Sequence, residues 1–299
     1  MLAPIALFVY NRPSHTQITL NALALNLESK DSELFIFCDG EKENCSDLEK
    51  ENVKLVRIIV QNENRFKKTN IIYQTSNIGL ANSIIGGVNK VINEFGKVIV
   101  LEDDILPSLG FLSYMNEALN LYETDDNVGC IHAWNYHLNT EKYKTTTFFL
   151  KGADCWGWGT WQRAWNYFNH DSSFLLETIQ NNKMEFEFNR KGTHDYISML
   201  QNQILGKIDS WAIRWHASIF INKMYCLHPV IPIVKNIGLD NSGTHCGIVD
   251  LNQQTVEYIN LEKLEVIEDE LFFFLYKKKV QKDKIMKLIE KIKKFKILI

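Results

Sequence analysis

The amino-acid sequence predicts an α/β fold in which a mostly parallel sheet is flanked by helices. Two observations predict this class. Short, continuously apolar runs recur through the first third of the chain, as expected for strands buried on both faces, and segments with helical spacing of apolar residues separate them. The composition, 45% hydrophobic and 23% charged over 299 residues, is that of a globular protein with a substantial core. It excludes disordered, fibrous and membrane-spanning classes.

Strands and helices are expected in alternation up to residue 104. The strand-like runs are residues 4–10, 33–40, 70–75 and 97–104. The helical stretches begin after Ser14, a suitable N-cap, and continue at about 48–60 and at 80–91, where apolar residues recur at helical spacing. After residue 124 the strands become shorter, and the aromatic segment CWGWGTWQRAW follows them. We expect this second half to form the other wall of a cleft.

Polar motifs stand at the carboxyl ends of three of the expected strands. They are Tyr10-Asn11-Arg12, Asp39-Gly40 and Glu102-Asp103-Asp104. Ligands of parallel α/β sheets lie at this edge of the sheet. The three motifs together therefore predict one convergent binding rim.

The consecutive acids Glu102, Asp103 and Asp104 need neutralising, because like charges repel and burial of an unpaired carboxylate is costly. We favour a hard divalent cation, Mg²⁺ or Mn²⁺, since such an ion takes oxygen ligands and brings phosphate oxygens with it. It would stabilise the charge on a departing diphosphate. The alternative is a solvated loop in which Asp103 or Asp104 caps the next helix.

A resemblance to a known family rests on several segments taken in order. They are FVYNRP, Asp39-Gly40, NIGLANSI, VLEDD, GADCWGWGTW, DSWAIRW and KNIGLDNSGTHCG, spread over residues 4–247. Their order and spacing resemble those of nucleotide-sugar glycosyltransferases of the GT-A fold, in particular bacterial family-2-like sugar transferases. The N-acetylglucosaminyltransferase that starts complex N-glycans is more distantly similar. The resemblance implies a nucleotide-sugar-binding half at 1–125 and an acceptor-side catalytic half of the same unit at 126–260. A basic helical tail is expected at 261–299 from its own residues, as described below.

The resemblance implies residues that contact the donor nucleotide. Contacts to base and ribose fall on Tyr10, Asn11, Arg12 and Asp39, and a carboxylate such as Asp39 suits the imide N–H of uracil. Asn77 and Gly79 fall where the family's helix start approaches the donor. The alternatives are a turn-forming role for Asp39 and helix capping by Asn77 and Gly79.

The resemblance also implies metal contacts. Asp104 is the expected direct ligand of Mn²⁺ or Mg²⁺, and Asp103 is expected nearer the ribose or the sugar. The sequence has Glu-Asp-Asp where the family motif is usually written DxD, so the assignment among the three acids stays open. His245, in a glycine-rich segment, is expected near the metal or the phosphates, with a structural role as the alternative.

Inverting transfer needs a general base that takes the proton of the acceptor hydroxyl. The resemblance places this base at Asp209, while Asp154 is the competing carboxylate and Asp195 a more distant one. The alternative for Asp209 is the N-cap of a helix that begins there. Arg214 either pairs with the diphosphate or forms an ordinary salt bridge to Asp209 or another acid.

Tryptophans of the second half are candidates for contact with sugars, because flat aromatic faces suit sugar rings. Trp158 lies among glycines and is expected near the donor sugar or the acceptor, whereas Trp161 and Trp165, at helical spacing, are expected in the core. The full set expected around the donor sugar and acceptor is Glu102, Asp154, Trp158, Trp211 and Arg214.

The end of the chain is basic. Residues 277–299 hold ten lysines and two acids, a charge of about +8 against about −11 for the rest of the chain. Apolar residues recur at helical spacing from Lys284 onward, which is typical of an amphipathic helix on an anionic membrane surface. The alternative is a helix docked on the body. A nucleic-acid partner is not expected, since the body is acidic and has no base-reading motif.

The expected activity is metal-dependent transfer of a sugar, hexosyl or N-acetylhexosaminyl, from a nucleotide-sugar whose expected nucleotide is UDP. The acceptor is a hydroxyl of a glycan, or of a lipid-linked or lipopolysaccharide molecule, as in polysaccharide biosynthesis, and the expected location is cytoplasmic, peripheral on the inner face of a bacterial plasma membrane. The six cysteines lack zinc-site spacing and are expected to be reduced thiols. The alternatives are a sugar-1-phosphate nucleotidylyltransferase and an inactive membrane-associated scaffold.

Overall fold

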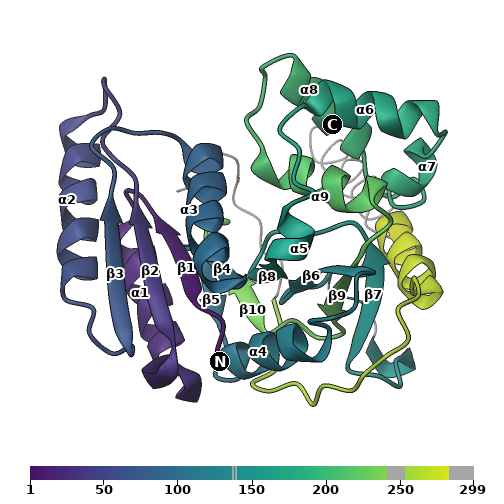
Figure 1. The fold of residues 1–299 in the computed structure, drawn as a ribbon, viewed down its shortest axis with the longest axis horizontal. Helices are drawn as coiled ribbons and strands as arrows, with labels where there is room; N and C mark the ends of the chain where they lie inside the picture. Colours follow the sequence, from purple (N-terminus) through teal and green to yellow (C-terminus); the bar gives the residue numbers. More distant parts are fainter. Residues whose placement is uncertain (137, 139, 241–252, 283–299) are drawn as a thin grey trace, which may run out of the picture.

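The computed structural model describes residues 1–136, 138, 140–240 and 253–282. Within these ranges the strands form an eight-stranded sheet of order β3-β2-β1-β4-β8-β6-β9-β7 and a small sheet that pairs β10 with β5 (Figure 1). The expected α/β class, with a mostly parallel sheet and flanking helices, is confirmed.

The first half of the large sheet is parallel. Its strands are β1 (Ile5–Val9), β2 (Glu33–Cys38), β3 (Lys68–Tyr73) and β4 (Lys97–Glu102). The register pairs Val9 with Cys38 and Phe8 with Glu102, so β1, β2 and β4 end at the same edge. The strands expected from apolar runs are therefore confirmed, and so is the common edge at which they end.

Helices cover both faces of this half. Apolar side chains of α1 (Pro13–Ala24) and α2 (Asp47–Gln61) pack on the face that carries Ile5 and Leu7, together with α4 (Phe111–Leu121). The opposite face, with Ala6 and Phe8, packs against α3 (Leu80–Phe95). The alternation of side chains along a strand produces the two cores. A short 3₁₀ helix, η1 (Leu27–Asp31), joins α1 to β2.

The second half extends the same sheet. Its strands are β6 (Val128–His132), β7 (Thr147–Lys151), β8 (Trp158–Trp161) and β9 (Tyr225–Pro229), and β8 joins the halves by pairing antiparallel with both β4 and β6. The small sheet is formed by β5 (Ile105–Pro107) and β10 (Val234–Asn236). The remaining elements are η2 (Thr140–Lys142), α5 (Gln162–Trp165), α6 (Ser172–Asn181), α7 (Glu185–Phe188), α8 (Tyr196–Ile204) and α9 (Trp211–Ile221).

An aromatic core lies where β8, α5 and α9 meet. Trp158 stacks on Trp211 with ring centroids 5.2 Å apart, and Trp165 lies 4.9 Å from Trp215. Trp161 and Trp165 are buried, which confirms the expectation that they are core residues.

Residues 270–282 are helical and dock on the body beside β7 (yellow in Figure 1). Phe272, Phe273 and Tyr276 are buried in a cluster with Phe148 and Val230. The amphipathic segment expected from Lys284 onward lies outside the described residues. Within the described ranges, no helix combines the length and the apolar character that crossing a membrane requires. The five described cysteines are free thiols, and Cys246 lies outside the described ranges.

Candidate active site

The acids Glu102, Asp103 and Asp104, called the acid cluster below, follow the central strand β4 and are withdrawn from solvent. Asp103 is 3% exposed and Asp104 is 9% exposed, while Glu102 is partly buried. Neither aspartate caps a helix, since Gly110 is the N-cap of the next helix, α4. The interpretation of a solvated or capping loop is therefore wrong, and a buried, negatively charged cluster needs a cation.

Arg12 supplies one such cation within the chain. It follows β1, and its guanidinium pairs with the carboxylate of Asp103 and donates from Nη1 to Oδ2 of Asp104 at 2.9 Å. Adjacent parallel strands explain the meeting, because β1 and β4 end side by side. A guanidinium fork suits two neighbouring carboxylates.

One guanidinium does not neutralise three acids. Burial, with Asp104 and Asp103 adding to it, raises the pKa of Glu102 to about 8. Burial also raises the pKa of Asp103 to about 6, although Arg12 opposes the shift. The arrangement disfavours full ionisation and leaves an excess of carboxylate oxygens, the donor set that Mg²⁺ and Mn²⁺ prefer. The residues present therefore fit a hard divalent cation.

The segment after β10 covers the acid cluster. Ile237 donates its backbone N–H to the carbonyl oxygen of Asp104 at 2.8 Å. A Cβ atom placed on Gly238 would lie 2.2 Å from Oδ2 of Asp104, so only glycine allows this approach. His15 contacts the carboxylate of Asp240 at 3.2 Å. His245, expected near the metal, lies outside the described residues.

Asp39 organises the neighbouring part of the rim. One carboxylate oxygen accepts the backbone N–H groups of Gly40 (2.8 Å) and Ile78 (2.9 Å). The other accepts from the side-chain amide of Asn77 (2.9 Å) and from the N–H of Gly79 (3.1 Å). The structure thus brings three expected nucleotide contacts together, Asp39, Asn77 and Gly79. Because the carboxylate already accepts four hydrogen bonds, its described role is to hold the start of α3.

Tyr10 and Asn11 lie partly buried between β1 and α1. The hydroxyl of Tyr10 is buried and has no hydrogen-bond partner among the described residues, and the ammonium of Lys42 lies 5.8 Å from the centre of its ring. A polar atom of this kind beside the rim is a position where a ligand can supply the missing partner.

Asp209 lies at the surface before α9. Its side chain is 60% exposed and accepts from Nη2 of Arg214 at 2.9 Å. The salt bridge considered for Arg214 is therefore confirmed. The N-cap of α9 is Ser210, whose hydroxyl accepts from the N–H of Ile213, so the capping alternative for Asp209 is wrong. Asp209 is left as an accessible carboxylate with one cationic partner.

Trp158 and Trp211 are placed differently from what the sequence suggested. Trp158 is 1% exposed, and Trp211, which stacks on it, is also buried. Neither ring has a face open to a sugar, because β8 runs through the middle of the sheet and α9 covers it. The expectation that Trp158 and Trp211 contact the donor sugar or the acceptor is therefore wrong.

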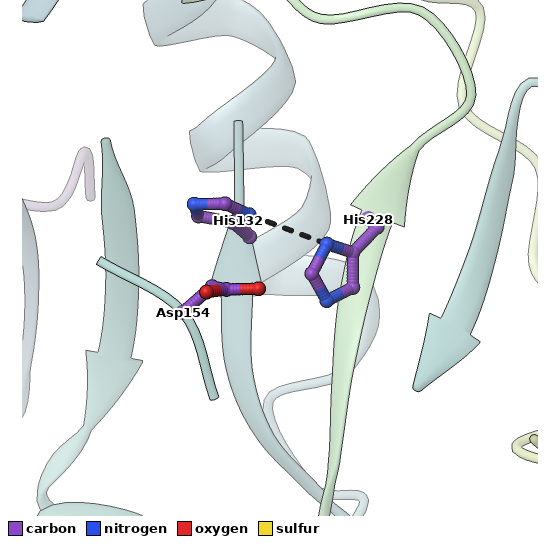
Figure 2. Close-up of side chains that lie close together, drawn as sticks. All are labelled: His132, Asp154 and His228. Atoms are coloured by element: carbon purple, nitrogen blue, oxygen red, sulfur yellow. Dashed lines mark hydrogen bonds between the residues drawn. The ribbon is translucent and has the colours of Figure 1, made fainter. Parts of the chain in front are cut away.

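Asp154 lies in a second polar cluster that the sequence did not reveal in full. Its carboxylate pairs with Arg190 at 2.7 Å, and its oxygens lie within 4.8 Å of ring nitrogens of His132 and His228 (Figure 2). Burial alone would raise the pKa of Asp154, but Arg190 and the histidines hold it well below its usual range. The sequence offered one signal, a histidine as the last residue of β6 and another as the last but one of β9. No local pattern marked Arg190.

By spacing, His132, Asp154 and His228 could hold a metal ion. The hydrogen bonds favour another arrangement. The N–H of Trp156 donates to Nε2 of His132 at 3.1 Å, which leaves the ring proton on Nδ1, and Nδ1 lies 3.2 Å from Nδ1 of His228. Both nitrogens of His132 are then engaged, and the guanidinium of Arg190 already balances Asp154. We interpret this group as a buried hydrogen-bonded support.

Cys155 connects the two clusters. Burial, with the charges of Asp154, Glu102 and Asp104 adding to it, raises the pKa of its thiol well above the usual value. The thiol of Cys155 therefore interacts electrostatically with carboxylates of both clusters.

Comparisons with known proteins give likenesses of fold. No protein-family model matches the chain, and no curated protein matches it. Among solved structures the chain is similar to S. aureus TarS, at TM-score 0.40 and 10% identity over 76% of this chain and 36% of that chain. A TarS 1–349 structure gives TM-score 0.39 and 10% identity over 76% of this chain and 60% of that one.

A third solved structure, apo mouse xyloside xylosyltransferase 1, gives TM-score 0.36 and 12% identity over 64% of this chain and 76% of that one. The chain thus spans about a third of one TarS chain and three fifths of the other. All three solved structures are similar to this chain at TM-scores below 0.5. At such TM-scores they add no detail of site or reaction.

Proposed function

We propose that this protein is a metal-dependent glycosyltransferase that moves a sugar from a UDP-sugar to a hydroxyl group of a glycan or glycolipid, with inversion. The observation that supports it best is the buried acid cluster at the end of β4, beside the ends of β1 and β2. Ligands of parallel α/β sheets bind at this edge. The acid cluster is also one of the segments that resemble nucleotide-sugar glycosyltransferases.

The metal would be held by Asp104, with Glu102 and Asp103 close by and His245 as a further candidate. When bound, Mn²⁺ or Mg²⁺ would stabilise the negative charge of the leaving diphosphate. The chain's own residues do the rest. Asp39 fixes the loop before α3 through four hydrogen bonds. The buried hydroxyl of Tyr10, at the same rim, is available to form a hydrogen bond with the donor.

Asp209 is the proposed general base. It is exposed to an incoming acceptor, and its carboxylate has one described partner, Nη2 of Arg214 at 2.9 Å. A carboxylate in this position can accept the proton of the acceptor hydroxyl. Asp154 is a weaker candidate, because Arg190 holds its pKa well below the usual range. A carboxylate with so low a pKa takes up a proton poorly. Asp154 is therefore proposed to have a structural role as the partner of Arg190.

We also propose that residues 277–299 contact an anionic membrane surface, on the inner face of a bacterial plasma membrane, where lipid-linked acceptors lie. Support comes from the described start of this segment: Lys277 and Lys278 are exposed, and the exposed ring of Phe274 lies between Lys278 and Lys142. Basic side chains around an exposed aromatic ring suit the lipid interface.

To test this proposal, the purified protein is incubated with Mn²⁺ and each of a panel of UDP-sugars. The release of UDP and the formation of product are measured. We expect Asp104→Asn and Asp209→Asn each to lower turnover at least about 100-fold, the range in which catalytic groups act. Asp126→Asn, at an exposed surface carboxylate, is the matched control and should leave turnover unchanged. If no UDP-sugar is bound or cleaved by the unmodified protein, the proposal fails.

A further inference from the structure

The guanidinium of Arg12 occupies the acid cluster as a cation would. It pairs with Asp103 and donates to Oδ2 of Asp104 at 2.9 Å. The side chain of Arg12 is 18% exposed, so most of it is withdrawn from water together with the acids it pairs with. Arginine keeps its proton in proteins and therefore cannot leave the cluster by becoming neutral.

Space around this pair is limited. A Cβ atom on Gly238 would lie 2.2 Å from Oδ2 of Asp104 and 2.9 Å from Nη1 of Arg12. The backbone after β10 therefore closes over the two groups. A divalent ion that takes Oδ2 of Asp104 as a ligand would compete with Arg12 for that oxygen, and the two positive charges would also repel each other.

Only the side chain of Arg12 is free to leave. Its backbone is fixed as the N-cap of α1, where its carbonyl oxygen accepts from the N–H of Thr16 at 3.0 Å and from the hydroxyl of Thr16 at 2.9 Å. The long side chain has several rotatable bonds, so its guanidinium can move while this backbone anchor stays in place.

We propose that Arg12 is the resident counter-ion of the acid cluster, and that a divalent cation binds Asp104 only by displacing its guanidinium. This inference rests on the proposed function, in which Asp104 is a metal ligand. Arg12 thereby lowers the affinity of the free protein for the metal, and it balances part of the charge of the acid cluster when no metal is bound.

The test measures Mn²⁺ binding without nucleotide, through loss of the electron paramagnetic resonance signal of free Mn²⁺. Arg12→Gln removes the competing charge, so we expect it to bind Mn²⁺ at least about ten-fold more tightly than the unmodified protein. Arg12→Lys keeps the charge and should stay within about three-fold of it. Equal or weaker binding by Arg12→Gln overturns the inference.

A second measurement uses the unmodified chain, because Arg12→Gln leaves the buried Asp103 unpaired and can impair folding. The side-chain ¹⁵N resonance of Arg12, assigned by its absence in Arg12→Lys, is followed as Mg²⁺ is added. Its chemical shift should change to that of a solvated arginine side chain as Mg²⁺ binds. A resonance that stays unchanged while Mg²⁺ binds overturns the inference.

The outcomes separate the two proposals. If Mn²⁺ binds both proteins equally and sugar transfer is observed, only the role of Arg12 is wrong. If neither protein binds Mn²⁺ and no UDP-sugar is used, the proposed function fails and takes this inference with it.

Discussion

Asp154 and Arg190 form a buried ion pair, with Oδ2 and Nη2 2.7 Å apart and Arg190 only 3% exposed. The backbone of Arg190 is left-handed, with φ of 47°, so the surrounding structure holds it in a conformation that non-glycine residues seldom adopt. Nε and Nη1 of the same side chain have no partner among the described residues. The pair is therefore the main compensation for a buried charge.

Replacing Asp154 with asparagine should accordingly destabilise the fold by about 3–5 kcal/mol, because it leaves Arg190 buried and uncompensated. Urea unfolding followed by circular dichroism measures this. The exposed pair of Asp209 and Arg214 is the control, and Asp209→Asn should cost less than about 1 kcal/mol. A double variant, Asp154→Leu with Arg190→Met, should recover much of the loss. If Asp154→Asn and Asp209→Asn lower the free energy of unfolding equally, Asp154 and Arg190 do not form a buried pair of this kind.

Buried histidines around this pair predict acid lability. Burial, with Arg190 adding to it, lowers the pKa of His216 to about 4, and burial lowers that of His132 to about 4. Since a folded-state pKa below the unfolded value favours the neutral form in the fold, the stabilisation is complete above about pH 6.5. It is lost as the pH falls toward 4, on the order of 3 kcal/mol per histidine.

The measurement is the free energy of unfolding from pH 7.5 to 4.5. It should fall steeply below about pH 6.5. His216→Asn should make this fall shallower, whereas His170→Asn, at an exposed histidine, should leave it unchanged. A flat profile over this range would show that the histidines charge without penalty.

Two adjacent glycines of α3 should respond in opposite directions. A Cβ on Gly86 meets nothing within 4 Å, and alanine has the better helix propensity, so Gly86→Ala should stabilise by about 0.5–1 kcal/mol. A Cβ on Gly87 would lie 2.6 Å from the ring of Phe8 and 3.1 Å from that of Phe37. Gly87→Ala should destabilise by about 1–3 kcal/mol through overpacking.

Thermal unfolding of both variants, read against the unmodified protein, checks this prediction. Each serves as the control of the other, because the chemical change and the helix are the same. Equal shifts for the two would mean that α3 does not pack on β1 and β2 as described.

The sequence was a good guide wherever neighbours along the chain decide the structure. Apolar runs and helical spacing predicted the first four strands and their helices, and the parallel arrangement then brought Asp39 and Asp104 to one edge. The same local logic placed Trp161 and Trp165 in the core.

Features set by distant parts of the chain were not predictable in this way. Arg190 reaches Asp154 across 36 residues from a left-handed loop, and no local pattern marks it. The insertion of β8 between β4 and β6 buried Trp158, although its glycine neighbours suggested an accessible ring. At α9 two suitable capping residues are adjacent, and only the backbone geometry selects Ser210 over Asp209.

The last prediction separates the two roles considered for Asp39. Its carboxylate accepts four hydrogen bonds, among them the N–H groups of Ile78 and Gly79 at the start of α3. In Asp39→Asn one of the oxygens becomes an NH₂ group, which faces donors and can accept nothing, so two hydrogen bonds are lost. Bonds to a charged group contribute about 1.5–3 kcal/mol each, and we expect a loss of about 3 kcal/mol in the free energy of unfolding.

Urea unfolding and UDP binding, measured on the same Asp39→Asn sample, distinguish the roles. Asp47→Asn, at a carboxylate that is 99% exposed, is the control. It should change neither the free energy of unfolding nor the affinity for UDP. If Asp39 holds the loop before α3, stability falls, and UDP affinity falls with it because that loop loses its support. If Asp39→Asn is as stable as the unmodified protein and only UDP binding weakens, Asp39 is a direct contact to the base, and the four hydrogen bonds do not stabilise the loop.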